Sequence, residues 1–401
     1  MSPEGQFLMS PDIGNGFGIG LGQDGLLSAW GRDDTGSLGT GSTLVQRLPV
    51  VVPTPSLPTV TKLYAGLYAS YLWGPQQSIY GFGYTYPWFG APRMSSSPTV
   101  QPEIAGFSKV SDGATFNLAL KPDGTLWSVG SNSYGELGNG SISPNSTTSL
   151  HQILSLTNVK NCSAAGAGYF SLALKGDGTV WSWGDDSNGQ LGLGNYTSVM
   201  PIPQKINISN VVDIASGYGT GLALKSDGTV WNWGYTIDGL TSYAVPTQVT
   251  GLSSITSITT VDFLCVALKS DGTVWAIGDF WDSRSDLWYD TPTQIPGLTS
   301  ITAISSGDGH LLALRSDGTV WTFGLNLHGQ LGNSGTEPQF TTAIQVPGLH
   351  GITLISAGWY HNLAWGNGTL YSWGLDWYGG LGIGRKVIAL SPDPLTAITW
   401  N

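Results

Sequence analysis

A short stretch that recurs eight times constrains the fold of this 401-residue chain more than any other feature. In its clearest copy, Leu172–Gly184, an apolar triplet is followed by an Asp-Gly pair, a Thr-Val-Trp-x-Trp run and a glycine. An Asp-Gly pair suits the turn of a β-hairpin, and the alternating residues after it suit a strand. Each copy therefore predicts a β-hairpin that is followed by a glycine-rich loop.

The copies lie in register along most of the chain, and their terminal glycines recur every 44 to 54 residues. The eight copies are Ile19–Gly31, Tyr71–Gly83, Leu118–Gly130, Leu172–Gly184, Leu222–Gly234, Val266–Gly278, Leu312–Gly324 and Leu363–Gly374. Each repeat adds an inner strand before the hairpin and a Pro-x-x-Val or Pro-x-x-Ile strand after it, which gives four strands. Four-stranded repeats of this length are typical of β-propeller blades.

We therefore predict an all-β fold, a single closed β-propeller domain over residues 1–401. The eight hairpins favour eight blades, and seven blades are the alternative. An open solenoid exposes its terminal faces and needs polar caps, whereas a propeller closes on itself. The apolar run at 394–400 is expected to form a last strand that closes the ring beside the first blade.

The repeat resembles that of the regulator of chromosome condensation (RCC1) family of β-propellers. The resemblance rests on the pattern apolar-Ala-Leu-Lys-x-Asp-Gly-Thr-Val-Trp-x-Trp-Gly, then Gly-Gln-Leu-Gly, and is best in Leu172–Gly192 and Leu312–Gly332. It implies the propeller fold but no single function, because such propellers include a nucleotide exchange factor for a small GTPase, a plant light receptor and a secreted β-lactamase inhibitor. No acting residue of the exchange factor can be carried over, since those residues lie in loops outside the repeat.

Composition argues against several classes of partner. The formal net charge is −11 and the 15 Lys and Arg residues are scattered, whereas a nucleic-acid partner requires basic clusters. We expect no membrane insertion, because no segment has the length and apolarity of a membrane helix, and the start lacks the pattern of a signal peptide. The low charge, with abundant Gly, Ser, Thr and Asn, favours a virion or an extracellular surface, with the cytoplasm as the alternative.

Residues that could carry catalysis or bind metal have structural explanations. The Asp-Gly carboxylates occur once per repeat and are therefore spread around the ring rather than paired. His310 and His361 precede their apolar triplets where Phe170 stands in another copy, so this position predicts packing and a hydrogen bond within the blade. Cys162 and Cys265 are expected to be buried. We predict no catalytic residue, no metal site and no cofactor, and hence no enzyme; a catalytic site in the central channel would need a converging polar set, which the sequence does not reveal.

The loops that break the repeat are the candidate binding sites. Most repeats continue into a Gly-x-Leu-Gly loop, but the second, fifth and sixth replace it at residues 84–92, 235–243 and 279–290. Exposed aromatic clusters are typical of contact surfaces. The predicted binding residues are Tyr84, Tyr86, Trp88, Phe89, Tyr235, Tyr243, Phe280, Trp281, Trp288 and Tyr289. The alternative is that these rings fold inward over their own blades.

These features favour a non-enzymatic binding or structural protein that contacts another protein through loops on one face and the rim of the ring. A glycan is the second candidate, because Trp and Tyr with nearby Asp also suit sugar rings. The preferred setting is a virion or cell-surface attachment component, and an oligomer or larger assembly stays open. The alternative function is a cytosolic regulator that resembles a guanine-nucleotide exchange factor for a small GTPase.

Overall fold

The structure, a computed structural model, describes most of the chain between residues 60 and 375. The gaps in this range are 67–68, 75–77, 85–93, 102–103, 114, 166–167, 236–241, 262 and 280–287. Outside it, the structure describes Leu381 and the strand segments 12–13, 17–21, 27–31, 45–51 and 389–394. The regular elements among these residues are the β-strands β1 to β32. None of the described segments forms a helix long and apolar enough to cross a membrane.

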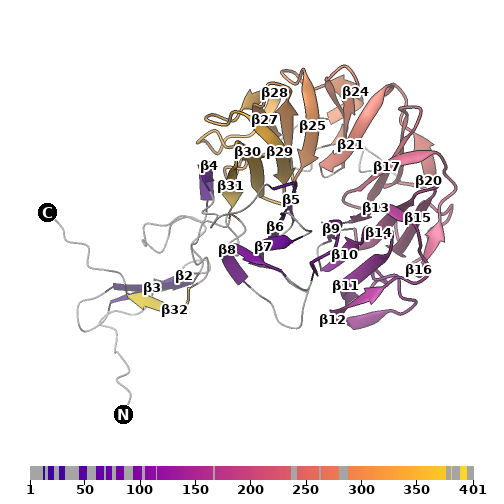
Figure 1. Ribbon diagram of the computed structural model, residues 1–401, viewed down its shortest axis with the longest axis horizontal. Helices are drawn as coiled ribbons and strands as arrows, with labels where there is room; N and C mark the ends of the chain where they lie inside the picture. The colour runs from indigo at the N-terminus through magenta and orange to yellow at the C-terminus, as the bar shows by residue number, and fades with distance from the viewer. Residues whose placement is uncertain are drawn as a thin grey trace, which may run out of the picture.

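Seven four-stranded antiparallel sheets stand around a common centre (Figure 1), and we call them blades I to VII. Blade I comprises β5 (Lys62–Ala65), β6 (Ala69–Trp73), β7 (Ile79–Tyr84) and β8 (Met94–Val100). Blade II comprises β9 (Lys109–Asp112), β10 (Phe116–Leu120), β11 (Leu126–Asn132) and β12 (Ser143–Gln152). Blade III comprises β13 (Val159–Ala164), β14 (Phe170–Lys175), β15 (Val180–Asp185) and β16 (Val199–Lys205).

The later blades repeat the same order from the inner to the outer strand. Blade IV comprises β17 (Val211–Ser216), β18 (Thr220–Lys225), β19 (Val230–Tyr235) and β20 (Ser242–Gln248). Blade V comprises β21 (Ile255–Val261), β22 (Leu264–Lys269), β23 (Val274–Asp279) and β24 (Trp288–Gln294). Blade VI comprises β25 (Ile301–Ser306), β26 (His310–Arg315), β27 (Val320–Gly324) and β28 (Gln339–Gln345). Blade VII comprises β29 (Ile352–Ala357), β30 (His361–Gly366), β31 (Thr369–Leu375) and, from far upstream, β4 (Val45–Val51).

The expectation of eight blades is wrong, and the structure has seven. The first hairpin copy forms β2 (Phe17–Leu21) and β3 (Leu27–Gly31), which pair with β1 (Asp12–Ile13) and β32 (Ala389–Pro394) in a sheet beside the ring (Figure 1). The reason is that β4, which follows this hairpin, pairs with β31 and completes blade VII, so the first hairpin has no place in the ring.

The ring closes, but not through the C-terminal strand that the sequence suggested. β32 pairs with β3 outside the ring, and residues 395–400 of the predicted strand lie outside the described part of the chain. Closure is instead made by β4 in blade VII and by contacts of β29 and β30 with β5 of blade I. An N-terminal strand that completes the last blade joins the two ends of the repeat array by backbone hydrogen bonds.

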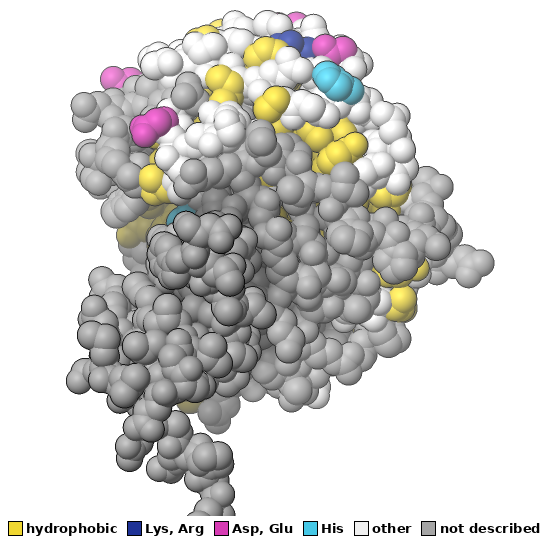
Figure 2. All heavy atoms as spheres, turned by 90° about the vertical axis from the view of Figure 1, so that its left-hand side faces the viewer, with side chains coloured by type: hydrophobic (Ala, Val, Ile, Leu, Met, Phe, Trp, Pro, Cys, Tyr) yellow, Lys and Arg dark blue, Asp and Glu magenta, His cyan; other side chains and the backbone are white. Residues whose placement is uncertain are grey.

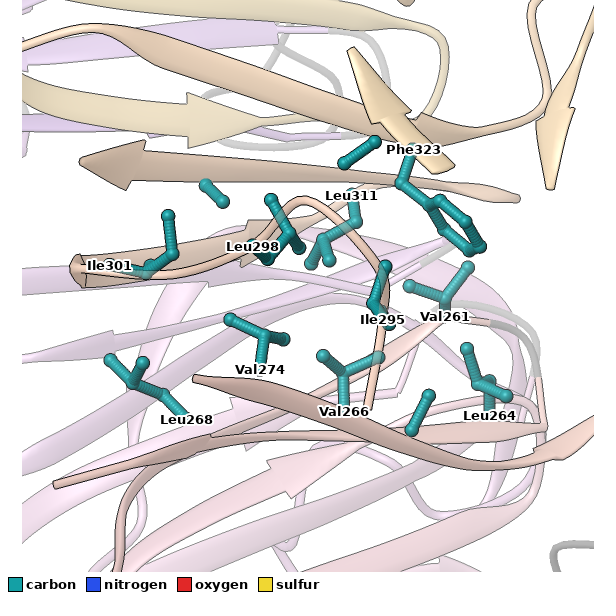
Figure 3. Packing of buried hydrophobic residues seen from close by; sticks show 13 residues of the cluster. Val261, Leu264, Val266, Leu268, Val274, Ile295, Leu298, Ile301, Leu311 and Phe323 are labelled. Atoms are coloured by element: carbon teal, nitrogen blue, oxygen red, sulfur yellow. The ribbon is translucent and has the colours of Figure 1, made fainter. Parts of the chain in front are cut away.

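The hydrophobic core is divided into seven clusters, one between each pair of neighbouring blades. Between blades V and VI, for example, Val261, Val266 and Val274 face Leu298 and Phe323 (Figure 3). The cluster between blades VII and I includes Leu72, Phe82, Leu363 and Leu370, which are fully buried, so the closing interface has an apolar core like the others. Burial of apolar surface between consecutive blades therefore continues around the whole ring.

Candidate functional site

Loops of two kinds share one end of the ring. Because neighbouring strands run antiparallel, the loop between the first and second strands of a blade lies at the same end as the loop between its third and fourth strands. The Asp-Gly turns lie at the opposite end. Tyr134, from the second kind of loop in blade II, stacks on Tyr169, from the first kind in blade III, with ring centroids 4.7 Å apart. We call this end the loop face.

Three aromatic residues on the loop face, Tyr169, Tyr218 and Trp359, line the mouth of the central channel, and we call them the collar. Tyr218 is 49% exposed and lies 5.8 Å from the ring of Phe263, between centroids. Trp359 stacks on Tyr360 at 5.2 Å. Sequence reasoning missed the collar; its signal was an aromatic residue that follows a glycine shortly before the apolar triplet in several repeats.

The channel itself is a cavity of about 610 Å³, walled by the inner strands of all seven blades. Its wall is hydrogen-bonded at every boundary between blades. The bridging pairs, in order from boundary I–II to boundary VII–I, are Tyr64 with Asp112, Ser111 with Ala164, Ser163 with Ser216, Thr260 with Ser216, Thr259 with Ser306, Ser305 with Ala357, and Ser356 with Ala65. The small hydroxyl side chains of the inner strands therefore hold the blades together where the apolar clusters end.

Charged groups gather on one side of this channel, on blades II to IV. The Lys109 ammonium donates to Asn161 Oδ1 at 2.5 Å, and Asn161 Nδ2 donates to Asp213 Oδ1 at 2.9 Å. Burial raises the pKa of the Asp213 carboxyl and raises the pKa of Asp112 to about 7. The structure thus shows a converging polar set that was not expected from the sequence, because its members come from separate strands.

The predicted binding residues have different surroundings. Tyr243 is 46% exposed on β20, and the Tyr196 hydroxyl donates to the Ser242 carbonyl beside it at 3.0 Å. Tyr235 is half-buried and lies edge-on to Phe263 at 5.8 Å between centroids. Tyr289 is half-buried against the cluster between blades V and VI, and this burial raises its pKa.

For the other predicted residues the structure is less informative. Tyr84 ends β7 and Trp288 begins β24, but their side chains are outside the described part of the structure. Tyr86, Trp88, Phe89, Phe280 and Trp281 lie outside the described residues altogether. The role of these residues in binding stays a prediction.

The regular Gly-x-Leu-Gly loops are built into the following blade. A strand tryptophan of that blade donates its indole N–H to a loop carbonyl in three pairs, Trp183 to Glu136, Trp233 to Gln190 and Trp373 to Gln330, at 2.7–3.0 Å. Gly192 shows how close the contact is, since it has a φ of 70° and a Cβ there would lie 2.8 Å from Trp233 Cδ1. Glycine is therefore required by both the backbone conformation and the tryptophan.

A second hydrogen bond holds each regular loop to its own blade. A Ser or Thr hydroxyl of the third strand donates to the loop leucine carbonyl in four blades, through Ser128, Ser182, Thr322 and Ser372. Blades I, IV and V, which carry the irregular loops, have Gly81, Asn232 and Ala276 at this position. The blades that follow them have Val129, Ile277 and Phe323 in place of the tryptophan. The chain thus lacks both anchoring groups wherever it lacks the regular loop.

Two expectations about buried groups can be compared with the structure. Cys162 and Cys265 are buried, as expected. His310 bonds within its own blade, as expected, through Nδ1 to the Asp308 carbonyl at 3.5 Å, and also to the next blade, with Nε2 2.7 Å from Asn362 Oδ1. The hydrogen bond of His361 is to the next blade, with Nε2 2.9 Å from Ser70 Oγ. Burial lowers the pKa of both histidines, to about 4 for His361. Among the described residues, no group of three or more His, Cys, Asp or Glu could hold a metal ion.

Comparison with known proteins agrees with this geometry. The sequence matches the regulator of chromosome condensation (RCC1) repeat over residues 177–224 and 317–365, and a second description of the same repeat over 301–330. A Protein RCC2 homolog from Xenopus laevis is 37% identical over 106 residues, which make up 26% of this chain and 20% of that relative. The match therefore spans only about a fifth of the relative's length.

Two solved structures share the fold. Human WBSCR16 superimposes with a TM-score of 0.67 at 22% identity, over 86% of this chain and 97% of that one. Yeast RCC1 (Prp20), solved with bound Kap60, gives a TM-score of 0.64 at 19% identity, over 87% of this chain and 89% of that one. The chain therefore contains repeats of the regulator of chromosome condensation (RCC1) type at residues 177–224 and 301–365, and its ring resembles the solved RCC1-type β-propellers in fold.

Proposed function

We propose that this chain is a protein-binding β-propeller that contacts its partner through the loop face. The observation that carries the proposal is the gathering of aromatic rings at the channel mouth, where Tyr134 and Tyr218 are 39% and 49% exposed. Aromatic side chains provide much of the binding energy in protein interfaces. The structure of yeast RCC1 with bound Kap60 is an example of a protein partner for this fold.

The irregular loops of blades I, IV and V add to this surface in the proposal. The strands beside these loops lack the hydroxyl, and the next blades lack the tryptophan, that tie a regular loop, and the proposal assigns the loop residues a contact with the partner instead. Tyr243 and Tyr235 stand at the two ends of one such loop. In the described part of the face shown in Figure 2, hydrophobic side chains are scattered and charged ones are few, which also suits a protein surface.

Neither the glycan partner nor the virion or cell-surface setting gains support from the family match, so the proposal is limited to a protein partner. The regulator of a small GTPase stays as the alternative, on the strength of the family resemblance alone. A nucleotide-release assay with candidate GTPases distinguishes the two: stimulated release would favour the regulator, and no stimulation would remove it.

A photo-crosslinking experiment tests the loop face directly. We would place benzoylphenylalanine at Tyr218, Tyr243 or, as the control at the opposite end, Leu154, which is 80% exposed. All three positions are exposed, so we expect stability to change by no more than about 0.5 kcal/mol. In the native source, positions 218 and 243 should give the same protein adduct and position 154 none. Adducts from position 154 alone would contradict the proposal.

A further inference from the structure

The channel mouth combines aromatic rings with carboxylates at two depths. Asp308 lies at the rim beside Trp359, whose carbonyl accepts from the Asp308 N–H at 3.0 Å. Asp112 lies further in, on the last residue of β9. From this arrangement we propose that one arginine side chain of the protein partner enters the mouth, stacks on the collar and pairs with Asp308 and Asp112. This inference rests on the proposed function and adds the chemistry of the partner.

The Asp112 carboxylate occupies space that is open only because residue 66 is glycine. A Cβ on Gly66 would collide with the Asp112 carboxylate, and the Gly66 carbonyl accepts from the Trp359 N–H at 3.2 Å. The Asp112 carboxylate of blade II and the backbone N–H of the collar residue Trp359 in blade VII therefore both lie next to this glycine of blade I.

The balance of charge in the cavity favours a cation. The described lining residues include three carboxylates, Asp112, Asp213 and Asp308, and a single cation, Lys109. Lys109 already donates to Asn161, which in turn donates to Asp213. The formal net charge of −11 adds a long-range attraction for a basic partner. Burial raises the pKa of Asp112 to about 7, and an incoming cation would stabilise its ionised form.

A guanidinium fits this mouth better than an ammonium. It is planar, stacks on aromatic faces and offers two parallel donors to a carboxylate. The cavity of about 610 Å³ is within the usual range of ligand pockets and has room for one such side chain. The Ser and Thr hydroxyls of the channel wall supply further acceptors.

The test uses the full chain labelled with 5-fluorotryptophan, with the Trp359 resonance assigned by Trp359→Phe. The probe is N-acetylarginine N-methylamide, and the matched neutral probe is the citrulline analogue. We expect the Trp359 signal to shift and saturate in the millimolar range with the arginine probe alone. Asp112→Asn should weaken this binding at least about tenfold, as expected for loss of a charged hydrogen-bond partner. Asp227→Asn, in an exposed turn at the opposite end, should leave it unchanged.

Each other outcome counts against an arginine site at the channel mouth. Equal shifts with citrulline, no shift at all, or unchanged affinity in Asp112→Asn would overturn it. Tighter binding of spermidine than of the blocked arginine would indicate a free polyamine and would also overturn it. Crosslinking at position 218 without arginine binding would reject the arginine site but still support protein binding through the loop face, so the two failures can be told apart.

Discussion

Two kinds of interface, three of each, occupy six of the seven boundaries between blades. At boundaries II–III, III–IV and VI–VII, a tryptophan of one blade donates to a loop carbonyl of the blade before it. At boundaries I–II, IV–V and V–VI the corresponding residues are Val129, Ile277 and Phe323, which have no polar hydrogen to donate. We call the first kind capped and the second kind uncapped.

The difference shows that the type of loop in one blade and the hydrogen-bond donors that the next blade presents to it vary together. At the capped boundary VI–VII, Trp373 pairs with Asn362 across the strands, and both donate to the Gln330 carbonyl. At the uncapped boundary V–VI, the equivalent cross-strand pair is Leu311 with Phe323, inside an apolar cluster (Figure 3). A donor left without its carbonyl would be buried unpaired, which costs about 1–3 kcal/mol, so both donors are replaced together.

The largest effect is expected for Asn362→Leu, which gives a capped boundary the side chain of an uncapped one. Asn362 Oδ1 accepts from His310 Nε2 at 2.7 Å, and Asn362 Nδ2 donates to the Gln330 carbonyl at 2.8 Å, in a fully buried position. Loss of both bonds leaves the buried His310 Nε2 without its acceptor and takes one of two donors from the Gln330 carbonyl, which keeps Trp373. We expect the free energy of unfolding to fall by about 2–5 kcal/mol. Chemical denaturation measures it.

The double variant Asn362→Leu, Trp373→Phe sharpens this test, because it copies the whole uncapped pair. We expect it to lose more than the sum of the two single variants, since each single variant leaves one donor on the Gln330 carbonyl and the double variant leaves none. A loss below about 1 kcal/mol for Asn362→Leu would show that the cap contributes little.

Much of the repeat could be read from the sequence, because its signals are local. Asp177 was predicted as a turn residue, and its Oδ1 accepts from the Thr179 N–H and hydroxyl. The number of blades could not be read in this way. Hairpins can be counted along the chain, but the pairing of β4 with β31 joins residues more than 300 positions apart and leaves one hairpin outside the ring.

The candidate site was visible only in part for the same reason. The irregular loops stand out locally, and Tyr243 is exposed as the binding hypothesis requires. The replacement of tryptophan by Val129 or Ile277 has meaning only once the loop of one blade is known to contact the next. The chain of Lys109, Asn161 and Asp213 likewise depends on the register of three inner strands. Blade I departs from the pattern in which a regular loop is followed by a blade with a tryptophan. It follows the regular loop that contains Leu381, but Phe82, which has no N–H in its side chain, stands at the tryptophan position.

A smaller effect is expected when one cap is removed without altering the strand pair. Trp233→Phe keeps an aromatic ring in a fully buried position but removes the N–H that bonds the Gln190 carbonyl at 2.9 Å. We expect a loss of about 1–3 kcal/mol, together with faster amide hydrogen exchange in the loop before it. The matched control is Phe323→Trp at an uncapped boundary. It should not stabilise the protein, and a gain there would show that a partner carbonyl is present after all.

The smallest effect concerns pH at the uncapped boundary I–II, where the Asp112 N–H bonds Tyr64 in the channel wall. Burial raises the pKa of Asp112 from 3.8 to about 7, so the folded state holds a proton that the unfolded state releases near pH 4. The free energy of unfolding should therefore decrease as the pH rises from about 4 to 7, and Asp112→Asn should remove at least about 1 kcal/mol of this decrease.

The groups that face Asp112 do not reverse this sign. Tyr64 on β5 and Cys162 on β13 have pKa values raised by burial, so neither ionises in this window, and Lys109 on its own strand bonds Asn161. Chemical denaturation between pH 4 and 8, with Asp227→Asn as the exposed control, measures the difference. Parallel profiles for the wild type and Asp112→Asn would contradict the raised pKa of Asp112. In that case the uncapped boundary would be as insensitive to pH as a boundary whose cap is an uncharged indole.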